Sequence, residues 1–417
     1  MLPAVLSACA QRDDRGSGPE RIILIVVDTL RRDHVSAYGS PVQTPNIDRL
    51  AAAGQVFENA VSAFHSTTMS MAALFTGHTP SIESGDRTRT LEWNTFASCG
   101  LARFAAAGGN DSCVPGGLDT LAEGLRSAGY WTVGAVSNRL LFRPYGYDQG
   151  FDEWIEVGAT EAGNEPAAAS RSARTRTARQ VNRSVKAALQ SRPSDRFFLY
   201  VHYIDVHDWI LFGISYPESV VRFDRELGAL LEYLEAEGLL EDAVIVFTSD
   251  HGEMLVDRKL HFDVKRHFGN PSFEPLLRVP LIVVPGSRRD PSALIRSQDV
   301  MGLVGELAGI GGGPQPDLEA DELLVTEQLF QTYRRGRWKS LWERTRPEVL
   351  LFDLEQDAGE TQDVSGSHPE VVEAHWKRIE ALSESLAAPD AEKRELDQEA
   401  LDRLKALGYL DEEGTGP

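Results

Sequence analysis

The sequence is short of positive charge and has no long hydrophobic run. Its 417 residues contain 42 lysines and arginines against 63 aspartates and glutamates, a formal net charge of −21. A surface of that sign argues against nucleic-acid or anionic-membrane binding through long-range charge. No stretch approaches the roughly 18 apolar residues of a membrane-spanning helix. An anionic substrate would therefore need a local source of positive charge, and a bound metal ion is one such source.

Cysteine is also scarce, with three residues in the chain. Cys9 ends the tetrapeptide Leu6-Ser7-Ala8-Cys9, which resembles the bacterial lipobox, where a cysteine after small residues becomes lipid-modified. On this interpretation residues 1–20 are a signal remnant and linker, and we expect an exported bacterial protein, either periplasmic or anchored through lipid on Cys9. A frayed terminus with a chance cysteine is the alternative. Outside the cytoplasm, Cys99 and Cys113 are expected to pair.

The rest of the chain alternates apolar runs with amphipathic segments, which is typical of an α/β fold. Strands are expected at 22–27, 131–136, 196–203, 243–248 and 278–284, and helices at 45–51, at 67–75, from 118 onward and at about 215–236. This alternation predicts a mixed, mostly parallel sheet with helices on both faces. Residues 83–117 interrupt the rhythm as an expected surface insertion. Residues 159–192 interrupt it again, and their arginines are expected on a solvated helix face: Arg171, Arg174, Arg176, Arg179 and Arg183.

Side chains that suit metal binding follow two of the predicted strands. Asp28 comes directly after the first strand, and Asp250 and His251 follow the strand at 243–248. In an open α/β sheet, side chains at the carboxyl ends of the strands converge on the ligand crevice. Two carboxylates and an imidazole gathered there could hold a divalent cation and activate a nucleophile. The alternative is that each acid caps the helix that follows its strand.

A hydroxyl-rich turn, Ser66-Thr67-Thr68, opens the predicted helix at 67–75. A hydroxyl at a helix N-terminus lies near backbone N–H donors and the positive end of the helix dipole, which favour an alkoxide and an incoming anion. A neighbouring divalent cation would lower the pKa of such a hydroxyl further. Each of these hydroxyls could equally be a simple N-cap, so the local sequence leaves both roles open.

An ordered series of motifs resembles the sulfatase family of the alkaline phosphatase superfamily. The motifs are Asp28-Thr29-Leu30-Arg31-Arg32-Asp33-His34, Thr44-Pro45-Asn46-Ile47-Asp48-Arg49-Leu50-Ala51, Leu74-Phe75-Thr76-Gly77, Ala128-Gly129-Tyr130, Gly150-Phe151-Asp152, His202-Tyr203-Ile204-Asp205-Val206-His207, Ser249-Asp250-His251-Gly252-Glu253 and Leu351-Phe352-Asp353-Leu354. The resemblance covers roughly residues 21–410. It implies a catalytic domain at 21–310, a smaller C-terminal α+β subdomain at 311–417, and hydrolysis of charged esters.

The resemblance places Thr67 at the nucleophile position. Sulfatases carry Cys-x-Pro-Ser-Arg ahead of a Thr-Gly pair, and the cysteine, sometimes a serine, is oxidised to formylglycine. Counting back from Thr76-Gly77, Thr67 occupies the cysteine position, and Met69 and Met71 replace the proline and the arginine. Threonine cannot form the formylglycine aldehyde, so no formylglycine is expected. Phosphodiesterase and phosphoethanolamine-transferase relatives use threonine directly and form a covalent phospho-enzyme.

The same resemblance implies one divalent metal ion, bound by Asp28, Thr67, Asp250 and His251. Thr29 stands where the family has the second acid of an Asp-Asp pair, which leaves the site one carboxylate short. Two carboxylates and a neutral imidazole suit Mn, Zn or Mg, whereas the oxygen-rich sites of sulfatases favour Ca.

Four further residues are expected at the substrate. His207 would donate a proton to the leaving oxygen, with a satisfied loop histidine as the alternative. His202 alternates with apolar neighbours and is expected to support the site from the core. His267 falls near a family histidine, offset by about one position. Asn138 stands where sulfatases have a lysine that holds sulfate.

Three functions fit these residues. The first is a hydrolase of phosphate esters, or of sulfate esters, acting through Thr67. The second is a true sulfatase. The third is a metal-containing binding protein that has lost turnover, which the missing arginine, lysine and second acid suggest. The expected partner is a small anionic ester rather than nucleic acid, and the sequence carries no signal for the leaving group.

Overall fold

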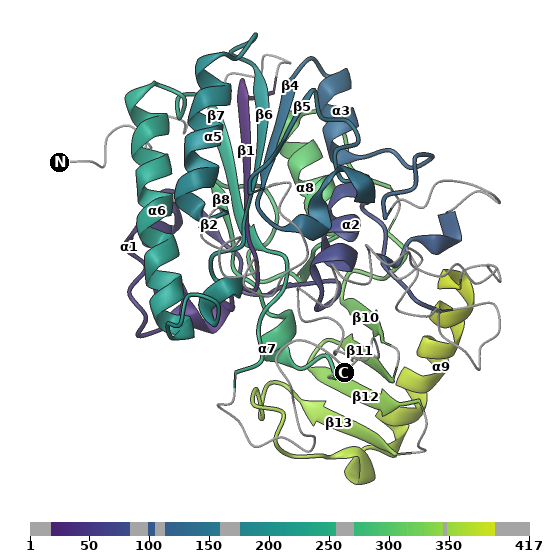
Figure 1. Cartoon of the computed structure of the whole chain (residues 1–417). Coiled ribbons are helices and arrows are strands. Elements are labelled where there is room, and N and C mark those ends of the chain that lie inside the picture. The colour runs from purple at the N-terminus through teal and green to yellow at the C-terminus, as the bar shows by residue number, and fades with distance from the viewer. Residues whose placement is uncertain are drawn as a thin grey trace.

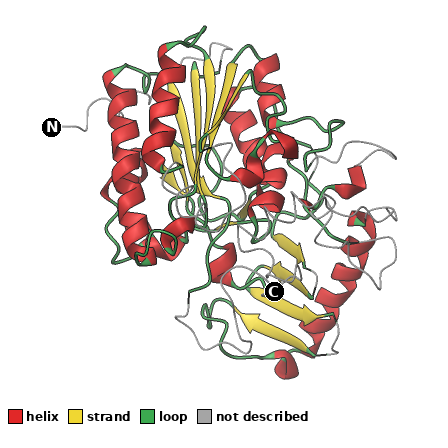
Figure 2. Cartoon of the chain, viewed as in Figure 1, coloured by secondary structure: helices red, strands yellow, loops and turns green. Residues whose placement is uncertain are grey.

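The structure is a computed structural model that describes residues 18–83, 99–104, 113–158, 176–255, 271–314, 316–327, 329–344 and 348–387. Within these ranges the chain builds a large α/β unit and, next to it, a smaller sheet with one long helix (Figures 1 and 2). The helices in this part of the chain include none that is long and apolar enough to span a bilayer. The tetrapeptide ending in Cys9 lies outside the described residues.

A seven-stranded sheet forms the centre of the α/β unit. Its strand order is β2-β8-β7-β1-β6-β4-β5, and the strands are β1 (Arg21–Val27), β2 (Gln55–Val56), β4 (Trp131–Val136), β5 (Glu153–Glu156), β6 (Phe197–Tyr203), β7 (Ala243–Ser249) and β8 (Leu281–Val284). The five strands from β7 to β5 are parallel, and β8 and β2 run antiparallel to their neighbours. The predicted mixed, mostly parallel sheet is confirmed.

Helices cover both faces of this sheet (Figure 1). On one face lie α1 (Pro45–Ala53), α5 (Ala178–Gln190) and α6 (Tyr216–Ala236), and on the other α2 (Thr67–Thr76), α3 (Leu121–Ser127) and α8 (Asp299–Ala308). Along β1, Ile22, Leu24 and Val26 pack in one core and Ile23, Ile25 and Val27 in the other. Because both faces are buried, the strand is a continuous apolar run rather than an alternating one.

The smaller sheet is antiparallel and carries the last helix. Its strands are β10 (Glu322–Thr326), β11 (Phe330–Arg335), β12 (Trp338–Glu343) and β13 (Val349–Asp353). Ile379 and Leu382 of α9 (Pro369–Leu386) share a buried cluster with Tyr333 and Trp342 of this sheet. The remaining short elements are α7 (Glu274–Leu277), β3 (Ala60–Val61) and β9 (Ile295–Arg296), and β3 pairs with β9. The domain boundaries at 20 and 310 stay a prediction.

The expected helix from residue 118 begins at Leu121, because Thr120 is its N-cap. The backbone N–H of Glu123 donates to Thr120 Oγ1 at 3.2 Å, and the Thr120 N–H donates to Glu123 Oε2 at 3.0 Å. This reciprocal pair satisfies two N–H groups at the helix start and so sets where the helix begins.

The expectation of a surface insertion at 83–117 stays a prediction, because the described part of this segment is buried at some positions and exposed at others, such as Gly116 and Gly117. Cys99, Leu101, Cys113 and Val114 are buried in the core beside α2 and α3. Cys99 and Cys113 form a disulfide, as predicted for an exported chain. The disulfide joins two buried positions within this segment and so closes the stretch between them.

The arginine-rich segment is exposed only in part. Arg179 and Arg183 face solvent on α5, as expected. Arg176 instead is buried, and its guanidinium lies 2.8 Å from a carboxylate oxygen of Asp208. Arg171 and Arg174 lie outside the described residues. The solvated-face interpretation is therefore wrong for Arg176, because a buried carboxylate pairs with it.

Candidate metal centre and nucleophile

The two central strands end level with each other, and this brings Asp28 and Asp250 together. Val27 at the end of β1 pairs with Ser249 at the end of β7, so the next residue of each strand leaves the sheet at the same height. Asp28, Asp250 and His251 are fully buried, and each offers a ligand atom within 4.8 Å of the others. The predicted convergence at the carboxyl edge of the sheet is present.

Two buried carboxylate oxygens in this cluster have no hydrogen-bond partner among the described residues. Asp250 Oδ1 accepts from the backbone N–H groups of Thr29 (3.0 Å) and His251 (2.7 Å), and Asp28 Oδ2 accepts from Asn138 Nδ2 (2.6 Å). The second oxygen of each carboxylate, Asp250 Oδ2 and Asp28 Oδ1, is left without a donor. An unsatisfied buried carboxylate oxygen is costly unless a cation pairs with it.

The imidazole of His251 completes the donor set. Its Nδ1 donates to the Gly252 carbonyl at 2.8 Å, and its Nε2 lies 3.6 Å from Asp250 Oδ2. Burial lowers the pKa of His251, which favours the neutral ring that metals bind. Two carboxylates and a neutral imidazole with open lone pairs fit a divalent cation.

The electrostatics of the aspartate pair point the same way. Burial raises the pKa of Asp250, and the charge on Asp28 raises it further. Burial also acts to raise the pKa of Asp28, but the nearby imidazoles of His202 and His207 hold it below its ordinary value. The pair therefore resists carrying two negative charges, and a cation between the carboxylates would remove that resistance.

Thr67 is the first residue of α2 and does not act as its cap. Ser66 occupies the N-cap position, and no side chain caps this helix end. The Thr67 hydroxyl is fully buried; it accepts from Asn138 Nδ2 at 3.3 Å and lies 3.5 Å from His251 Nε2. The same amide nitrogen of Asn138 thus contacts both Thr67 and Asp28, so the hydroxyl faces the carboxylate cluster.

Comparison with known protein families identifies the family of this chain. The profile of the sulfatase family matches residues 20–310. The chain belongs to the sulfatase family, a family of ester hydrolases. Among curated relatives, it is 31% identical to choline-sulfatase of Rhizobium meliloti over 34% of this chain and 31% of that protein. It is 24% identical to human arylsulfatase A over 89% of both chains.

Solved structures share the fold at low sequence identity. Phosphonate monoester hydrolase of Agrobacterium radiobacter superposes with a TM-score of 0.59 at 17% identity, covering 88% of this chain and 96% of that one. A protein solved with its substrate D-glucosamine-2-N,6-O-disulfate superposes with a TM-score of 0.60 at 16% identity, covering 89% and 98%. Sulfated sugars are therefore substrates among the structural relatives, and the sulfatase-like fold of this chain is established.

Thr29 and Met71, the positions at which the sequence analysis expected a departure from the sulfatase motif, have different surroundings. Thr29 follows Asp28 with a backbone φ of 59°, a rare conformation for a β-branched residue, and its N–H donates to Asp250 Oδ1. The bound N–H group gives a reason for the strained backbone. Met71 is buried against the hydroxyl of Tyr200, with the sulfur 4.0 Å away, so it belongs to the core rather than to an anion pocket.

The histidines expected at the substrate fall in different places. His207 begins a short 3-10 helix, η7 (His207–Trp209), and remains slightly exposed at 7%. His202 is fully buried on β6; its Nε2 lies 3.5 Å from Asp28 Oδ2 and its Nδ1 lies 2.9 Å from the Tyr200 hydroxyl. It therefore supports the Asp28 carboxylate from within the core. His267 lies outside the described residues.

Sequence reasoning missed the partners of His207. Asp208 Oδ1 accepts from His207 Nδ1 at 3.0 Å, and Asp208 in turn pairs with Arg176 at 2.8 Å. All three side chains are largely buried. Asp208 directly follows His207 in the sequence, so this partner could have been predicted. Arg176 is distant in the chain, and no local pattern indicates that it pairs with Asp208.

Proposed function

We propose that this protein is a metal-dependent hydrolase of phosphate or sulfate esters with Thr67 as its nucleophile. The observation that carries the proposal is the position of Thr67 Oγ1. It is buried at the N-terminus of α2, 3.5 Å from the imidazole of His251 and hydrogen-bonded by an amide that also holds Asp28. Asp28, Asp250 and His251 would hold one divalent cation, with Thr67 completing the set.

The metal would supply positive charge that stabilises the attacking oxygen and the anionic group under attack. Asn138 Nδ2 donates to Thr67 Oγ1, and the N-terminus of α2 presents its positive dipole end to the same oxygen. Both contacts favour the deprotonated oxygen over the hydroxyl. Mn, Zn and Mg suit this donor set, and Ca stays an option because oxygen ligands outnumber the imidazole.

The reaction would proceed in two displacements. Thr67 Oγ1, after losing its proton to solvent, forms a bond to the phosphorus or sulfur atom while the bond to the leaving oxygen breaks. His207 gives its Nε2 proton to that oxygen. Asp208 holds the His207 Nδ1–H, which keeps Nε2 as the nitrogen that exchanges protons. A water oxygen then forms a bond to the same phosphorus or sulfur atom while its bond to Thr67 Oγ1 breaks, and His207 Nε2 takes a proton from the water. This step releases the anionic product and restores Thr67 Oγ1.

Phosphate esters are the favoured substrates within this proposal. Formylglycine sulfatases release sulfate from an aldehyde hydrate, and Thr67 has no route to that aldehyde. Its ester intermediate must instead be broken by water, as in the phospho-enzymes of threonine-dependent relatives. The named curated relatives are sulfatases, so sulfate esters are the alternative substrate class. Within that class, sulfated sugars would be the substrates.

The test compares aryl phosphate mono- and diesters with aryl sulfates on purified protein supplied with Mn or Zn. We expect phosphate esters to be cleaved faster, Thr67→Ala to abolish turnover, and Thr67→Ser to retain much of it because the hydroxyl remains. Thr68→Ala, the next residue on the same helix, is the matched control and should remain active. Mass spectrometry of quenched reactions should find a phosphoryl group on Thr67. Sulfatase activity that survives Thr67→Ala would refute the mechanism.

If neither ester class is turned over while one metal ion is bound, the protein is a binding protein that retains the site without its chemistry. The missing arginine at Met71 and the missing second acid at Thr29 motivate that alternative. The absence of phosphoryl transfer to Thr67 in single-turnover mixtures would distinguish it from a slow enzyme.

We also propose that the chain is exported and carries lipid on Cys9. The Cys99–Cys113 disulfide supports an oxidising compartment, since structural disulfides are rare in the cytosol. The intact mass of native protein tests the lipid directly, because an unmodified Met1 in the mature chain would contradict it.

A further inference from the structure

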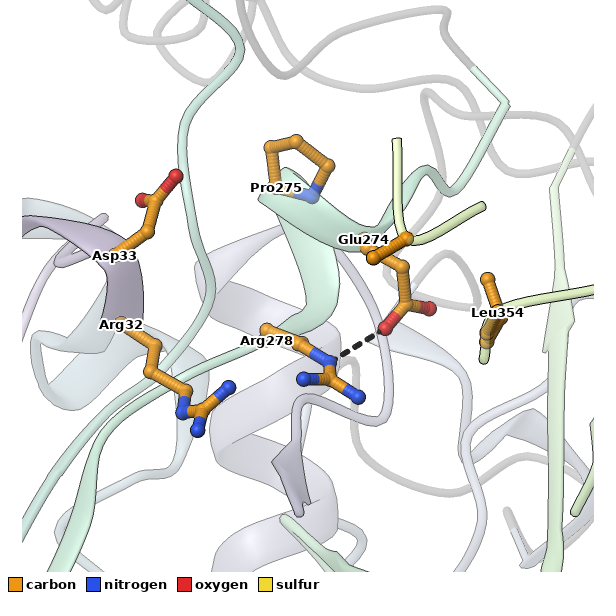
Figure 3. A pocket seen from close by; sticks show the side chains of 7 residues that line it. Arg32, Asp33, Glu274, Pro275, Arg278 and Leu354 are labelled. Carbon is orange, nitrogen blue, oxygen red and sulfur yellow. Dashed lines mark hydrogen bonds and ion pairs between the residues drawn. The ribbon is translucent and has the colours of Figure 1, made fainter. Parts of the chain in front are cut away.

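A cavity of about 150 Å³ is lined by none of the residues of the metal-ligand cluster (Figure 3). Its walls come from the 3-10 helix η1 (Arg32–His34), from α7 with the residue that follows it, and from the chain after β13. The lining residues are Arg32, Asp33, Glu274, Pro275, Arg278, Leu354 and Ala358. The cavity therefore lies where the α/β unit meets the smaller sheet.

Two arginines are held side by side in this cavity. The backbone N–H of Arg32 donates to the carbonyl of Arg278 at 3.3 Å, which fixes the two residues together. Figure 3 draws both side chains among those that line the cavity, with the guanidinium of Arg278 paired to Glu274. Burial lowers the pKa of Arg32, and the charge on Arg278 lowers it further. Two like charges at one place need a nearby anion to offset their repulsion.

The carboxylates of the cavity are already engaged. Glu274 is bound by three cations: Arg278 at 2.8 Å, Lys339 at 3.0 Å and Arg334 at 3.5 Å. Asp33 is bound by Arg31 at 2.6 Å. These acids therefore have little negative charge left to offer Arg32.

Arg32 itself forms no ion pair with any of the described residues. Glu58 and Asp33 act on it only at longer range. Its Nε is buried without a hydrogen-bond partner. One face of its guanidinium stacks on the ring of Tyr38, with Cζ 4.7 Å from the ring centroid, which holds the group in place without using its N–H donors. Within the part of the chain that the structure describes, Arg32 is therefore a cation held in place without a paired carboxylate, in a protein of net charge −21.

We propose that this cavity binds one oxyanion, a sulfate, phosphate or carboxylate group, between Arg32 and Arg278. A guanidinium presents a planar fork of N–H donors that matches such groups, and a second guanidinium doubles the charge. The oxyanion is either a free inorganic ion or a second anionic group on a substrate whose ester lies at Thr67. The site stands apart from the proposed chemistry, because none of its residues belongs to the metal cluster.

Equilibrium dialysis with radiolabelled sulfate on the full-length protein tests the site, with chloride keeping the ionic strength constant. Asp250→Ala removes a metal ligand, so sulfate that this variant still binds is outside the active site. We expect Asp250→Ala to keep one sulfate per chain. Arg32→Ala in that background should bind it about ten- to a hundredfold more weakly, and Arg32→Lys should lose less. Arg49→Ala, another half-buried arginine with an ion pair elsewhere, is the control and should bind normally.

Unfolding midpoints without sulfate establish that each variant is folded. Sulfate binding that is absent in Asp250→Ala, or that Arg32→Ala leaves unchanged, would overturn the proposal.

Steady-state kinetics of wild type and Arg32→Ala identify the source of the anion. A raised KM only for esters that carry a second, remote oxyanion identifies a substrate group. An unchanged KM for both ester types, together with lost sulfate binding, identifies a free ion. The binding arm needs no turnover, so its result is separate from that of the proposed hydrolysis.

Discussion

Without metal, the buried aspartate pair should make this protein less stable than a variant that lacks one of the two charges. The ligand atoms of Asp28 and Asp250 lie within 4.8 Å of each other, and both residues are fully buried. Two negative charges at that separation repel by about 3 kcal/mol at an effective dielectric constant near 20. Asp250→Asn removes this repulsion. The new amide can donate to Asp28, and its oxygen can still accept from Thr29 and His251.

We therefore expect metal-free Asp250→Asn to exceed the metal-free wild type in free energy of unfolding by up to about 3 kcal/mol at pH 8. The difference should depend on pH in a defined direction. The pKa of Asp250 is raised in the folded protein from 3.8 to about 7, so between these values the folded state binds more protons than the unfolded state. The stability of the metal-free wild type should then fall as pH rises through this range. Near pH 4 the two proteins should converge.

Saturating metal should reverse the order. The wild type should bind about one ion per chain and gain stability, whereas Asp250→Asn loses a ligand and should gain little. Urea unfolding with chelator and with Mn, from pH 4 to 8, measures all four states, and elemental analysis gives the stoichiometry. Asp224→Asn is the control. Asp224 is also a buried acid, but it lies on α6 and is hydrogen-bonded by Asn46 of α1, so its substitution should not change the response to metal. Equal stabilisation of wild type and Asp250→Asn by metal would refute the assignment of the site.

Three further changes have definite expected outcomes. Asp208→Asn should lower kcat by about 10²- to 10⁴-fold for esters with poor leaving groups and far less for a nitrophenyl ester, because only the former need a proton from His207; an equal loss for both would count against His207 as the acid. Replacing Cys99 and Cys113 with serine should cost about 3 kcal/mol of stability by urea unfolding, and in native protein both thiols should resist alkylation until reduced. Thr29→Asp should raise the affinity for Ca relative to Mn in competition assays, since an added carboxylate suits a hard cation and aspartate tolerates a positive φ better than threonine does; unchanged selectivity would place this side chain away from the ion.

Five of the seven strands of the large sheet were predictable because their signals are local, whereas the short strands β2 and β5 were not expected. The residues before Asp28 and before Asp250 form continuous apolar runs without alternation. Such runs are typical of strands that are buried on both faces. The bounds of β1 and β7 lie within a residue or two of those expected. The helix at Tyr216–Ala236 shows apolar residues at helical spacing and has Ser215 as its N-cap. Thr120 as a cap was equally local, and reading it would have placed the start of α3 correctly.

Parts of the candidate site were not predictable, because they depend on residues far apart in the chain. The amide of Asn138 contacts both Asp28 and Thr67, and those three residues come from three separate elements. His202 was expected to support the site from the core, but its contact with Asp28 could not be foreseen, because it depends on β6 lying next to β1.

The sequence by itself determined the alternating fold, the strand-end acids and the hydroxyl at the start of α2, because each depends on hydrophobic period, strand length or capping within a few residues. Only the tertiary structure decided which hydroxyl faces the cluster, which carboxylate oxygens lack donors, and which arginines are paired. The backbone hydrogen bond between Arg32 and Arg278 and the ion pair between Arg176 and Asp208 each join residues that are at least 32 positions apart in the chain. Such contacts follow from how the sheet and its helices pack, and no local pattern in the chain encodes them.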